Sequence, residues 1–199
     1  MEWEETDLFE EPDGATPLDP DESTGLLLSW VTTRADLNVA EQDNIDSAVA
    51  WTIRQRSSDF LTVDYAIKLH KRMFGQVWAW SGTFRETEKN IGIAPHRIGQ
   101  EMATLFDNVR YWVSASTFSH DEICIRLHHL LVYVHPFPNG NGRHARLMAD
   151  LLGGQLGIDV FTWGSASSYQ VSELRRSYIA ALQAADAHDY DPLLLFVRS

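Results

Sequence analysis

The chain has 199 residues, of which 44% are hydrophobic, and it carries a net charge of −12 at pH 7. This length is enough for one domain whose core needs no covalent staple. The single cysteine, Cys124, cannot form an internal disulfide, so we expect a reducing, cytoplasmic location. The composition argues against a membrane protein, because no run approaches the roughly 20 apolar residues that span a bilayer and the N-terminus does not resemble a secretory signal.

The negative charge is concentrated at the start of the sequence. Residues 1–22 hold ten acidic residues and no Lys or Arg, whereas the remainder is close to neutral. Such a composition is typical of a solvated segment. We therefore predict a flexible acidic arm over residues 1–25 and one domain over residues 26–199. Neither part offers the basic face that nucleic-acid binding requires, so no nucleic-acid partner is expected.

Helical periodicity dominates from about residue 26 onward, which predicts an all-α fold. A first helix is expected over about residues 38–56, where Asn38 and Glu41 resemble a capping box. Its apolar stripe consists of Ile45, Ala48, Val49, Thr52 and Ile53.

Further helices follow at regular intervals. One is expected over about residues 63–74, with Thr62 as its N-cap and Gly75 as its end. The others are expected over about residues 96–115, from Ser119 to about residue 134, from the turn at 139–142 to Gly153 and Gly154, over about 169–185, and from Asp191 to the end. Residues 80–95 lack a helical stripe and contain Gly82, Asn90 and Gly92, which indicates a β-hairpin or an irregular flap.

The stretch HPFPNGNGRHAR, residues 135–146, is the most informative part of the sequence. Two prolines should end the preceding helix near His135, and a Gly-rich turn then leads into the next helix. Unpaired backbone N–H groups at a helix N-terminus bind anions. Arg143 and Arg146 are three residues apart, so both guanidinium groups lie on the first turn and can bind phosphate oxygens.

His135 stands at the edge of this predicted phosphate site. A neutral imidazole can accept a proton from an attacking hydroxyl, so His135 is the candidate general base. Phe137 is expected to anchor the turn in the core. Each feature alone is commonly structural, but together they favour transfer of a phosphorus-linked group to an alcohol.

The same residues resemble the Fic-domain signature H-x-F-x-(D/E)-G-N-G-R-x-x-R. The matching positions are His135, Phe137, Gly140, Asn141, Gly142, Arg143 and Arg146. Residues 69–85, LHKRMFGQVWAWSGTFR, resemble the approach to the flap of that family. The segments FRETEKNIGIAP and ALQAADAHDYDPLLLFVR are also similar to the Fic subgroup labelled mobile mystery protein B. The similarity covers about residues 26–199.

This resemblance implies a helical bundle with a central helix-turn-helix active-site loop and a small β-hairpin flap. It also implies AMPylation, in which a Tyr, Thr or Ser hydroxyl of a target protein attacks the α-phosphate of ATP. By the resemblance, His135 is the general base, and the nucleotide phosphates are bound by Gly140, Asn141, Gly142, Arg143 and Arg146. The target would dock on the flap, which consists of Thr83, Phe84, Arg85, Glu86, Thr87, Glu88, Lys89, Asn90, Ile91, Gly92 and Ile93. The G-N-G-R sequence argues against the phosphorylating Doc-type branch.

Asn139 departs from the signature, which has Asp or Glu at this position to hold Mg²⁺. An Asn offers an oxygen without negative charge, whereas Mg²⁺ prefers charged oxygen ligands. We therefore expect ATP as substrate and a weakened Mg²⁺ site at Asn139. Three outcomes stay open: slow AMPylation, transfer from another phosphate-linked donor, or a binding protein without catalysis.

Two further interpretations concern regulation and rival functions. Many Fic proteins are inhibited by a Glu followed by Gly or Asn, and no Glu here has either neighbour, so we expect control by a separate antitoxin-like partner. A metal site is a less favoured alternative, and its candidate ligands are His128, His129, His135 and His144. A noncatalytic adaptor that uses the acidic arm and the flap is the other alternative.

Overall fold

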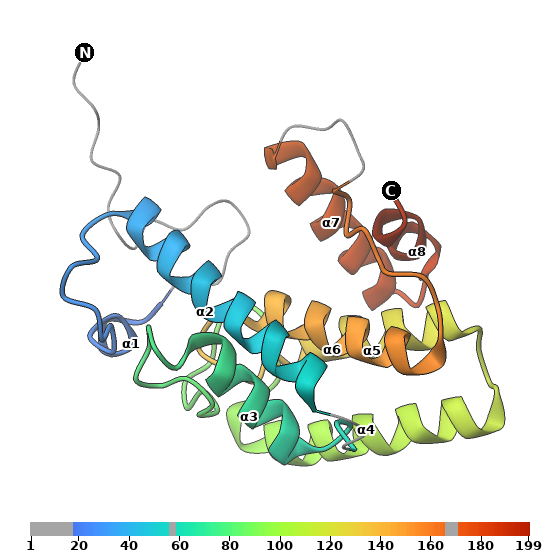
Figure 1. Cartoon of the computed structure of the whole chain (residues 1–199). Coiled ribbons are helices and arrows are strands. Elements are labelled where there is room, and N and C mark those ends of the chain that lie inside the picture. The colour runs from blue at the N-terminus through green and yellow to red at the C-terminus, as the bar shows by residue number, and fades with distance from the viewer. Residues whose placement is uncertain (1–17, 56–58, 166–170) are drawn as a thin grey trace.

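The computed structural model describes residues 18–55, 59–165 and 171–199. Within these ranges the protein is built from helices, and its only β-type pairing is one isolated bridge between Leu26 and Trp78. The elements are α1 (Pro20–Ser23), α2 (Arg34–Arg54), α3 (Val63–Phe74), the 3-10 helix η1 (Pro95–Arg97), α4 (Ile98–Ala115), α5 (His120–Val134), α6 (Asn141–Leu156), α7 (Val171–Asp186) and α8 (Asp191–Val197) (Figure 1). The predicted all-α fold is confirmed for the described residues.

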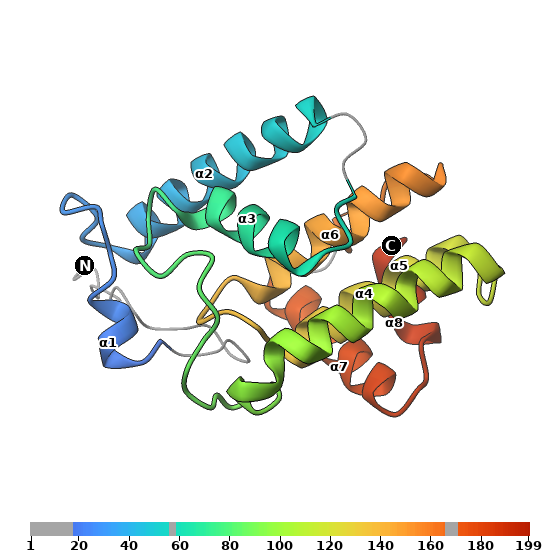
Figure 2. The same cartoon turned by 90° about the horizontal axis from the view of Figure 1, so that it is seen from below.

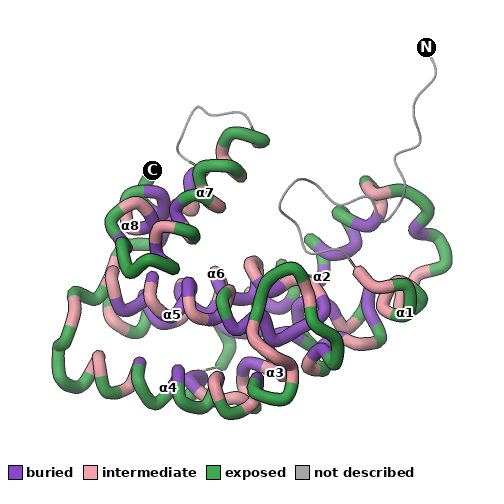
Figure 3. The backbone as a smooth tube through the Cα atoms, turned by 180° about the vertical axis from the view of Figure 1, so that it is seen from behind, coloured by how far each residue is buried: buried purple, intermediate pink, exposed green. Residues whose placement is uncertain are grey.

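Helices α5 and α6 form the centre of the molecule. They are consecutive helices joined by a short turn and packed along each other, with α4 running alongside α5 (Figures 1 and 2). Helices α2 and α3 cover one side of this pair, and α7 and α8 cover the other. The tube coloured by burial shows the buried residues gathered on α5 and α6 (Figure 3). The turn between α5 and α6 is therefore held between the two outer groups of helices.

The predicted caps of α3 and α5 are confirmed. The Thr62 hydroxyl accepts a hydrogen bond from the Tyr65 N–H at 3.1 Å, and the Ser119 hydroxyl accepts one from the Glu122 N–H at 3.2 Å. Each bond satisfies a donor that has no partner within its helix. Helix α3 also ends at the expected residue, before Gly75.

The predicted start of α2 is wrong. Thr33 is the N-cap, and its side chain and that of Asp36 form the capping box that Asn38 and Glu41 were expected to form. Glu41 lies one turn further into the helix and is buried. Of the expected apolar stripe, Ala48 and Thr52 are buried and Ile45 and Val49 are partly buried, but Ile53 is 78% exposed.

The predicted end of α6 at Gly153 and Gly154 is also wrong. The helix continues to Leu156, and Gly157, with φ of 70°, ends it in a left-handed conformation that suits glycine. Gly153 is buried against Ile158, where an added Cβ would lie 3.1 Å from the Ile158 side chain. This glycine serves close packing rather than helix termination.

Helix α1 falls in the segment that was counted with the acidic arm. The Glu22 carbonyl accepts a hydrogen bond from the Trp80 indole N–H at 3.0 Å, and the Glu22 carboxylate lies 2.6 Å from the Lys89 ammonium. Residues 18–25 are thus attached to the domain, while residues 1–17 of the predicted arm lie outside the described residues. None of the described helices is long and apolar enough to span a membrane.

Candidate active site

The turn between α5 and α6 is closed by the side chain of Asn141. Its amide oxygen accepts a hydrogen bond from the Phe137 N–H at 2.9 Å, and its amide nitrogen donates to the Phe137 carbonyl at 2.7 Å. Asn141 is 3% exposed, and Phe137 is fully buried, as predicted for an anchor. The Asn141 side chain thus holds the loop together, so only its backbone N–H can face a phosphate.

Gly140 is required at the start of α6 for two reasons. Its φ is 79°, which residues with a side chain rarely adopt, and an added Cβ would lie 2.6 Å from the Phe74 ring. The first intrahelical bond of α6 runs from the His144 N–H to the Gly140 carbonyl. The N–H groups of residues 141–143 precede it and lie at the positive end of the helix dipole, which makes this turn suitable for an anion.

His70 is a site residue that the sequence reasoning missed. The Gly82 N–H donates to Nδ1 at 3.0 Å, so Nε2 carries the proton and donates to the Asn139 carbonyl, also at 3.0 Å. Burial holds the pKa of His70 well below its usual value, so the ring is neutral, and it stacks on Phe137 with ring centroids 3.7 Å apart. His70 joins the turn to the start of the flap. The sequence signal that could have identified His70 is its place as a polar residue on the inner face of the amphipathic helix α3.

His135, the predicted base, caps α5 with φ of 52° and ψ of 61°. A residue other than glycine in this left-handed region is uncommon and often marks a functional site. His135 is 5% exposed, and burial lowers its pKa to about 4; the positive charges of Arg85 and Lys89 also lower it. The imidazole is therefore neutral near pH 7 and able to accept a proton.

Of the two forms expected for residues 83–93, the β-hairpin is wrong, because this described segment contains no strand. Instead it is an irregular flap braced from inside by Arg85, which is 2% exposed. The Arg85 side chain donates to the His135 carbonyl at 2.6 Å, to the Thr87 carbonyl at 2.8 Å and to the Ile93 carbonyl. Internal bonds to a guanidinium thus replace the strand pairing that a hairpin would have.

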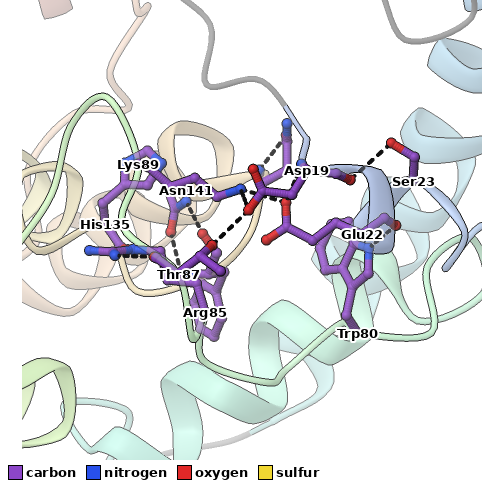
Figure 4. A network of polar contacts seen from close by, with 12 residues as sticks. Asp19, Glu22, Ser23, Trp80, Arg85, Thr87, Lys89, His135 and Asn141 are labelled. Carbon is purple, nitrogen blue, oxygen red and sulfur yellow. Dashed lines mark hydrogen bonds and ion pairs between the residues drawn. The ribbon is translucent and has the colours of Figure 1, made fainter. Parts of the chain in front are cut away.

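Other flap residues attach it to α1 and to the His135 side of the turn. The Lys89 ammonium lies 2.8 Å from the Asp19 carboxylate, and the Thr87 hydroxyl donates to the same carboxylate at 2.7 Å (Figure 4). Gly92 packs directly on the turn, since an added Cβ would lie 2.7 Å from Cβ of His135. The predicted docking residues that remain exposed are Thr83, Glu86, Thr87, Glu88, Asn90, Ile91 and Gly92. Phe84, Lys89 and Ile93 are half-buried.

The two predicted phosphate-binding arginines have different partners. Arg143 lies over the Phe74 ring at 4.8 Å, and its Nη1 is 2.6 Å from Glu41 Oε2. Glu41 is 5% exposed and also accepts a bond from the Trp78 indole N–H at 2.7 Å. Arg146 lies over the Tyr178 ring of α7 at 4.7 Å. A carboxylate therefore contacts Arg143. The inhibitory pattern, a Glu followed by Gly or Asn, did not predict this contact because Glu41 is followed by Gln.

The residues around Asn139 do not fit a protein-held Mg²⁺ site. The Asn139 side-chain oxygen already accepts a hydrogen bond from the Gly140 N–H at 2.6 Å. Glu41, a nearby carboxylate, is bound to Arg143. A neutral, engaged amide oxygen is a weak ligand for an ion that prefers charged oxygens. In the described structure, Asn139 and Glu41 are thus poor ligands for Mg²⁺.

The alternative histidine metal site is not formed in the described ranges, where no group of three or more potential metal ligands is found. His128 pairs with the Tyr178 hydroxyl at 2.9 Å, and His129 pairs with Tyr190 and Asp186. His144 is bonded to the Ala66 carbonyl at 3.0 Å. These imidazoles are therefore engaged in structural hydrogen bonds.

Replacing Gly140 with Ala should destabilise the protein by about 2 kcal/mol or more, because the new methyl group meets a buried ring and the backbone is left-handed. Urea unfolding would measure this change. Gly154→Ala is the matched control, since no heavy atom lies within 4 Å of a Cβ at that helical position. Equal stability of the two variants would contradict this account of the turn.

Comparisons with known proteins agree with this geometry. Residues 60–152 match the family model described as Fic/DOC family. The protein adenylyltransferase fic-1 of Caenorhabditis briggsae is 29% identical over 145 residues, which are 69% of this chain and 26% of that protein. The fic-1 protein of Caenorhabditis elegans is 25% identical over 182 residues, covering 87% of this chain and 34% of that protein. The chain thus spans about a quarter to a third of these curated relatives.

Solved structures share the arrangement of helices. A fragment of C. elegans Fic-1 superposes with a TM-score of 0.63 at 26% identity, covering 88% of this chain and 56% of that one. BepC from Bartonella tribocorum, solved with bound AMPPNP, gives a TM-score of 0.67 at 16% identity, covering 90% of this chain and 97% of that one, which shows the fold alone. Residues 60–152 thus match the Fic/DOC family model, and the chain shares the fold of C. elegans Fic-1.

Proposed function

We propose that this chain is a protein adenylyltransferase that transfers AMP from ATP to a Tyr, Thr or Ser hydroxyl of a target protein. The hydroxyl oxygen bonds to the α-phosphorus, the bond from that phosphorus to the oxygen bridging to the β-phosphate breaks, and pyrophosphate leaves. The names of the C. briggsae and C. elegans relatives support this reaction. So do the nucleotides AMPPNP and ADP in two solved proteins of the same fold.

The neutral imidazole of His135 beside the N-terminus of α6 is the observation that carries the proposal. His135 accepts the hydroxyl proton as the oxygen attacks. Its lowered pKa keeps it deprotonated at neutral pH, although the same shift makes it a weaker base. The rigid turn supports this role, because a base must be held within hydrogen-bond reach of the proton that it removes.

The phosphates would bind where the turn leads into α6. The backbone N–H groups of Asn141 and Gly142, together with Arg143 and Arg146, supply donors and positive charge for the triphosphate, and the Gly140 N–H would join them once the Asn139 side chain releases it. These five residues lie within the first turns of one helix, so a single rigid element would present them. Such prepositioned donors stabilise the charge that develops on the departing pyrophosphate.

The target protein would dock on the outer side of the flap. Its exposed residues lie next to His135, and Ile91 is a large apolar residue that is 44% exposed. A cavity of about 520 Å³ adjoins them, lined by Arg85, Glu86, Glu88, Pro95 and His96. Because the flap is not a strand in the described structure, docking as an added strand would require it to straighten.

The domain would extend from about residue 26, preceded by the acidic segment.

Replacing His135 with Asn should lower AMP transfer by at least about 100-fold, since Asn cannot accept the proton. Asn also tolerates the left-handed backbone, so the turn should persist. The measurement is transfer of label from α-labelled ATP to proteins of a cell lysate. Because the pKa of His135 is about 4, the imidazole is already neutral at about pH 6, so the wild-type rate should fall little between about pH 7.5 and pH 6.

His120→Ala is the control for this experiment, because His120 is exposed at the start of α5. It should label proteins at the wild-type rate. Absence of label with the wild type would overturn AMP transfer from ATP and favour another phosphate-linked donor or a nucleotide-binding protein without catalysis. Equal labelling by His135→Asn would remove His135 from the reaction.

Asn139→Asp should make ATP binding more dependent on Mg²⁺. The affinity of the wild type for ATP should change by no more than about threefold when Mg²⁺ is removed. The reason is that the charged ligands of Mg²⁺ come from the triphosphate alone and not from the protein. Calorimetric titration with and without Mg²⁺ would measure both proteins. A larger Mg²⁺ effect in the wild type than in Asn139→Asp would contradict the poor fit of this site to Mg²⁺.

We also propose that Glu41 restrains the site, in addition to or in place of a separate regulator. A carboxylate on Arg143 competes with phosphate for the same guanidinium, so it must move before Arg143 can bind ATP. Glu41→Gln should therefore raise ATP affinity several-fold while keeping an acceptor for the Trp78 indole. Calorimetric titration is again the measurement, with Glu122→Gln, which alters the distant Arg126 pair, as control. Weaker ATP binding by Glu41→Gln would show that Glu41 orients Arg143 instead.

A further inference from the structure

The C-terminal part of the chain reaches the start of α6. Tyr178 of α7 lies close to the predicted phosphate site, since a Cβ added at Gly142 would be 3.7 Å from its hydroxyl oxygen. Trp163, in the segment after α6, places its ring 5.6 Å from Arg146 Cζ. Neither Tyr178 nor Trp163 lies within residues 60–152, the part that matches the family model.

These two aromatic residues surround the guanidinium of Arg146. Cζ of Arg146 lies 4.7 Å from the ring centroid of Tyr178, within the range of an attractive cation–π contact. The positive charge of Arg146, close to the Tyr178 hydroxyl, opposes the rise in the pKa of Tyr178 caused by burial. Arg146 is thus held by neutral groups, which leave its positive charge available to an anion.

Both aromatic residues are themselves fixed by buried partners. The Tyr178 hydroxyl is 2.9 Å from Nε2 of His128, which is fully buried, and burial lowers the pKa of that imidazole to about 3, so it is neutral beside Arg146. The Trp163 indole N–H donates to the Asp150 carboxylate at 2.9 Å. Trp163 also has a φ of 51°, an uncommon backbone for a bulky residue that persists only where surrounding contacts enforce it.

Arg143 and Arg146 differ in whether a carboxylate is bound to the guanidinium. Arg143 has an aromatic face as well, that of Phe74, but a carboxylate occupies its Nη1. Among the described residues, no carboxylate lies within ion-pair distance of Arg146; the Asp150 carboxylate feels the charge of Arg146 but is bonded to the Trp163 indole. Of the two guanidinium groups, Arg146 is the one kept ready for phosphate.

We propose that Tyr178, assisted by Trp163, is a positioning residue that orients the Arg146 guanidinium toward the terminal phosphates of a bound nucleotide. This inference rests on the proposed function, because it assumes that the turn binds a nucleotide. The proposal gives the C-terminal helices a part in the phosphate site. Helix α7, which lies outside the matched residues 60–152, completes the site that the α5–α6 turn begins. The Tyr178 hydroxyl is also bonded to His128 of α5, so the ring that Arg146 lies over is fixed to α5 as well as to α7.

Tyr178→Phe tests the proposal, because it removes the hydroxyl and keeps the ring. ATP affinity should fall by about tenfold, because the ring beside Arg146 loses the hydrogen bond to His128 that fixes it. AMP affinity should stay within about twofold of the wild type, since AMP lacks the phosphates that Arg146 would bind. Calorimetric titration of each protein with ATP and with AMP gives both values.

Tyr190→Phe is the matched control. Tyr190 also joins the C-terminal helices to α5, through a 3.1 Å hydrogen bond between its hydroxyl and Nδ1 of His129, but it does not contact Arg146. A purely structural role of such bonds would make both variants lose ATP and AMP affinity alike, which would overturn the proposal. The selective loss of ATP affinity in Tyr178→Phe alone would support it.

The remaining outcomes also decide the question. Equal ATP affinity of Tyr178→Phe and the wild type would overturn the positioning role and leave the proposed function intact. Tighter ATP binding by Tyr178→Phe would overturn it too, since the hydroxyl would then obstruct the phosphate site. Failure of the wild type to bind ATP would remove the nucleotide function and the inference together.

Discussion

The closed turn between α5 and α6 is the constraint on which the candidate site depends. The Asn141 amide ties the turn to Phe137, and the neutral His70 ring ties it to Gly82 at the start of the flap. Buried polar groups of this kind are costly unless each has a partner, and here each bond also fixes the direction of a backbone segment. Because the Asn141 side chain is bonded to Phe137, the N–H groups of residues 141–143 are kept in place at the positive end of the α6 dipole.

Most of the helical framework could be predicted from the sequence, because local rules determine it. The caps at Thr62 and Ser119 need only neighbouring residues, and the predicted ends of α3 hold. The start of α2 could not be predicted in this way, since two capping boxes competed and the burial of Glu41 against Trp78, a long-range contact, decides which face turns inward. Gly153 was wrong as a helix end for a different reason: it packs against Ile158, which follows the helix, so it is there for close contact and not for termination.

The candidate site shows the same division between local and distant information. The positions of His135, Phe137, Gly140 and Asn141 follow from one short motif, and the structure brings them together in one turn. The partners of the two arginines do not follow, because Glu41 and Tyr178 are 102 and roughly 30 residues away along the chain. Arg85 is a further case: it was assigned to target docking from its place in the flap, yet it is 2% exposed and braces the loop from inside.

The left-handed backbone of His135 has a consequence for how related chains would diverge. Few residue types occupy φ of 52° without strain, and Asn, Asp and Gly are the main ones. A gene copy that acquired Asn or Gly would lose the proposed proton acceptor while its helices, turn and flap kept their places. Active and inactive descendants of such a scaffold would then be indistinguishable by shape, and only the chemistry of a single side chain would separate them.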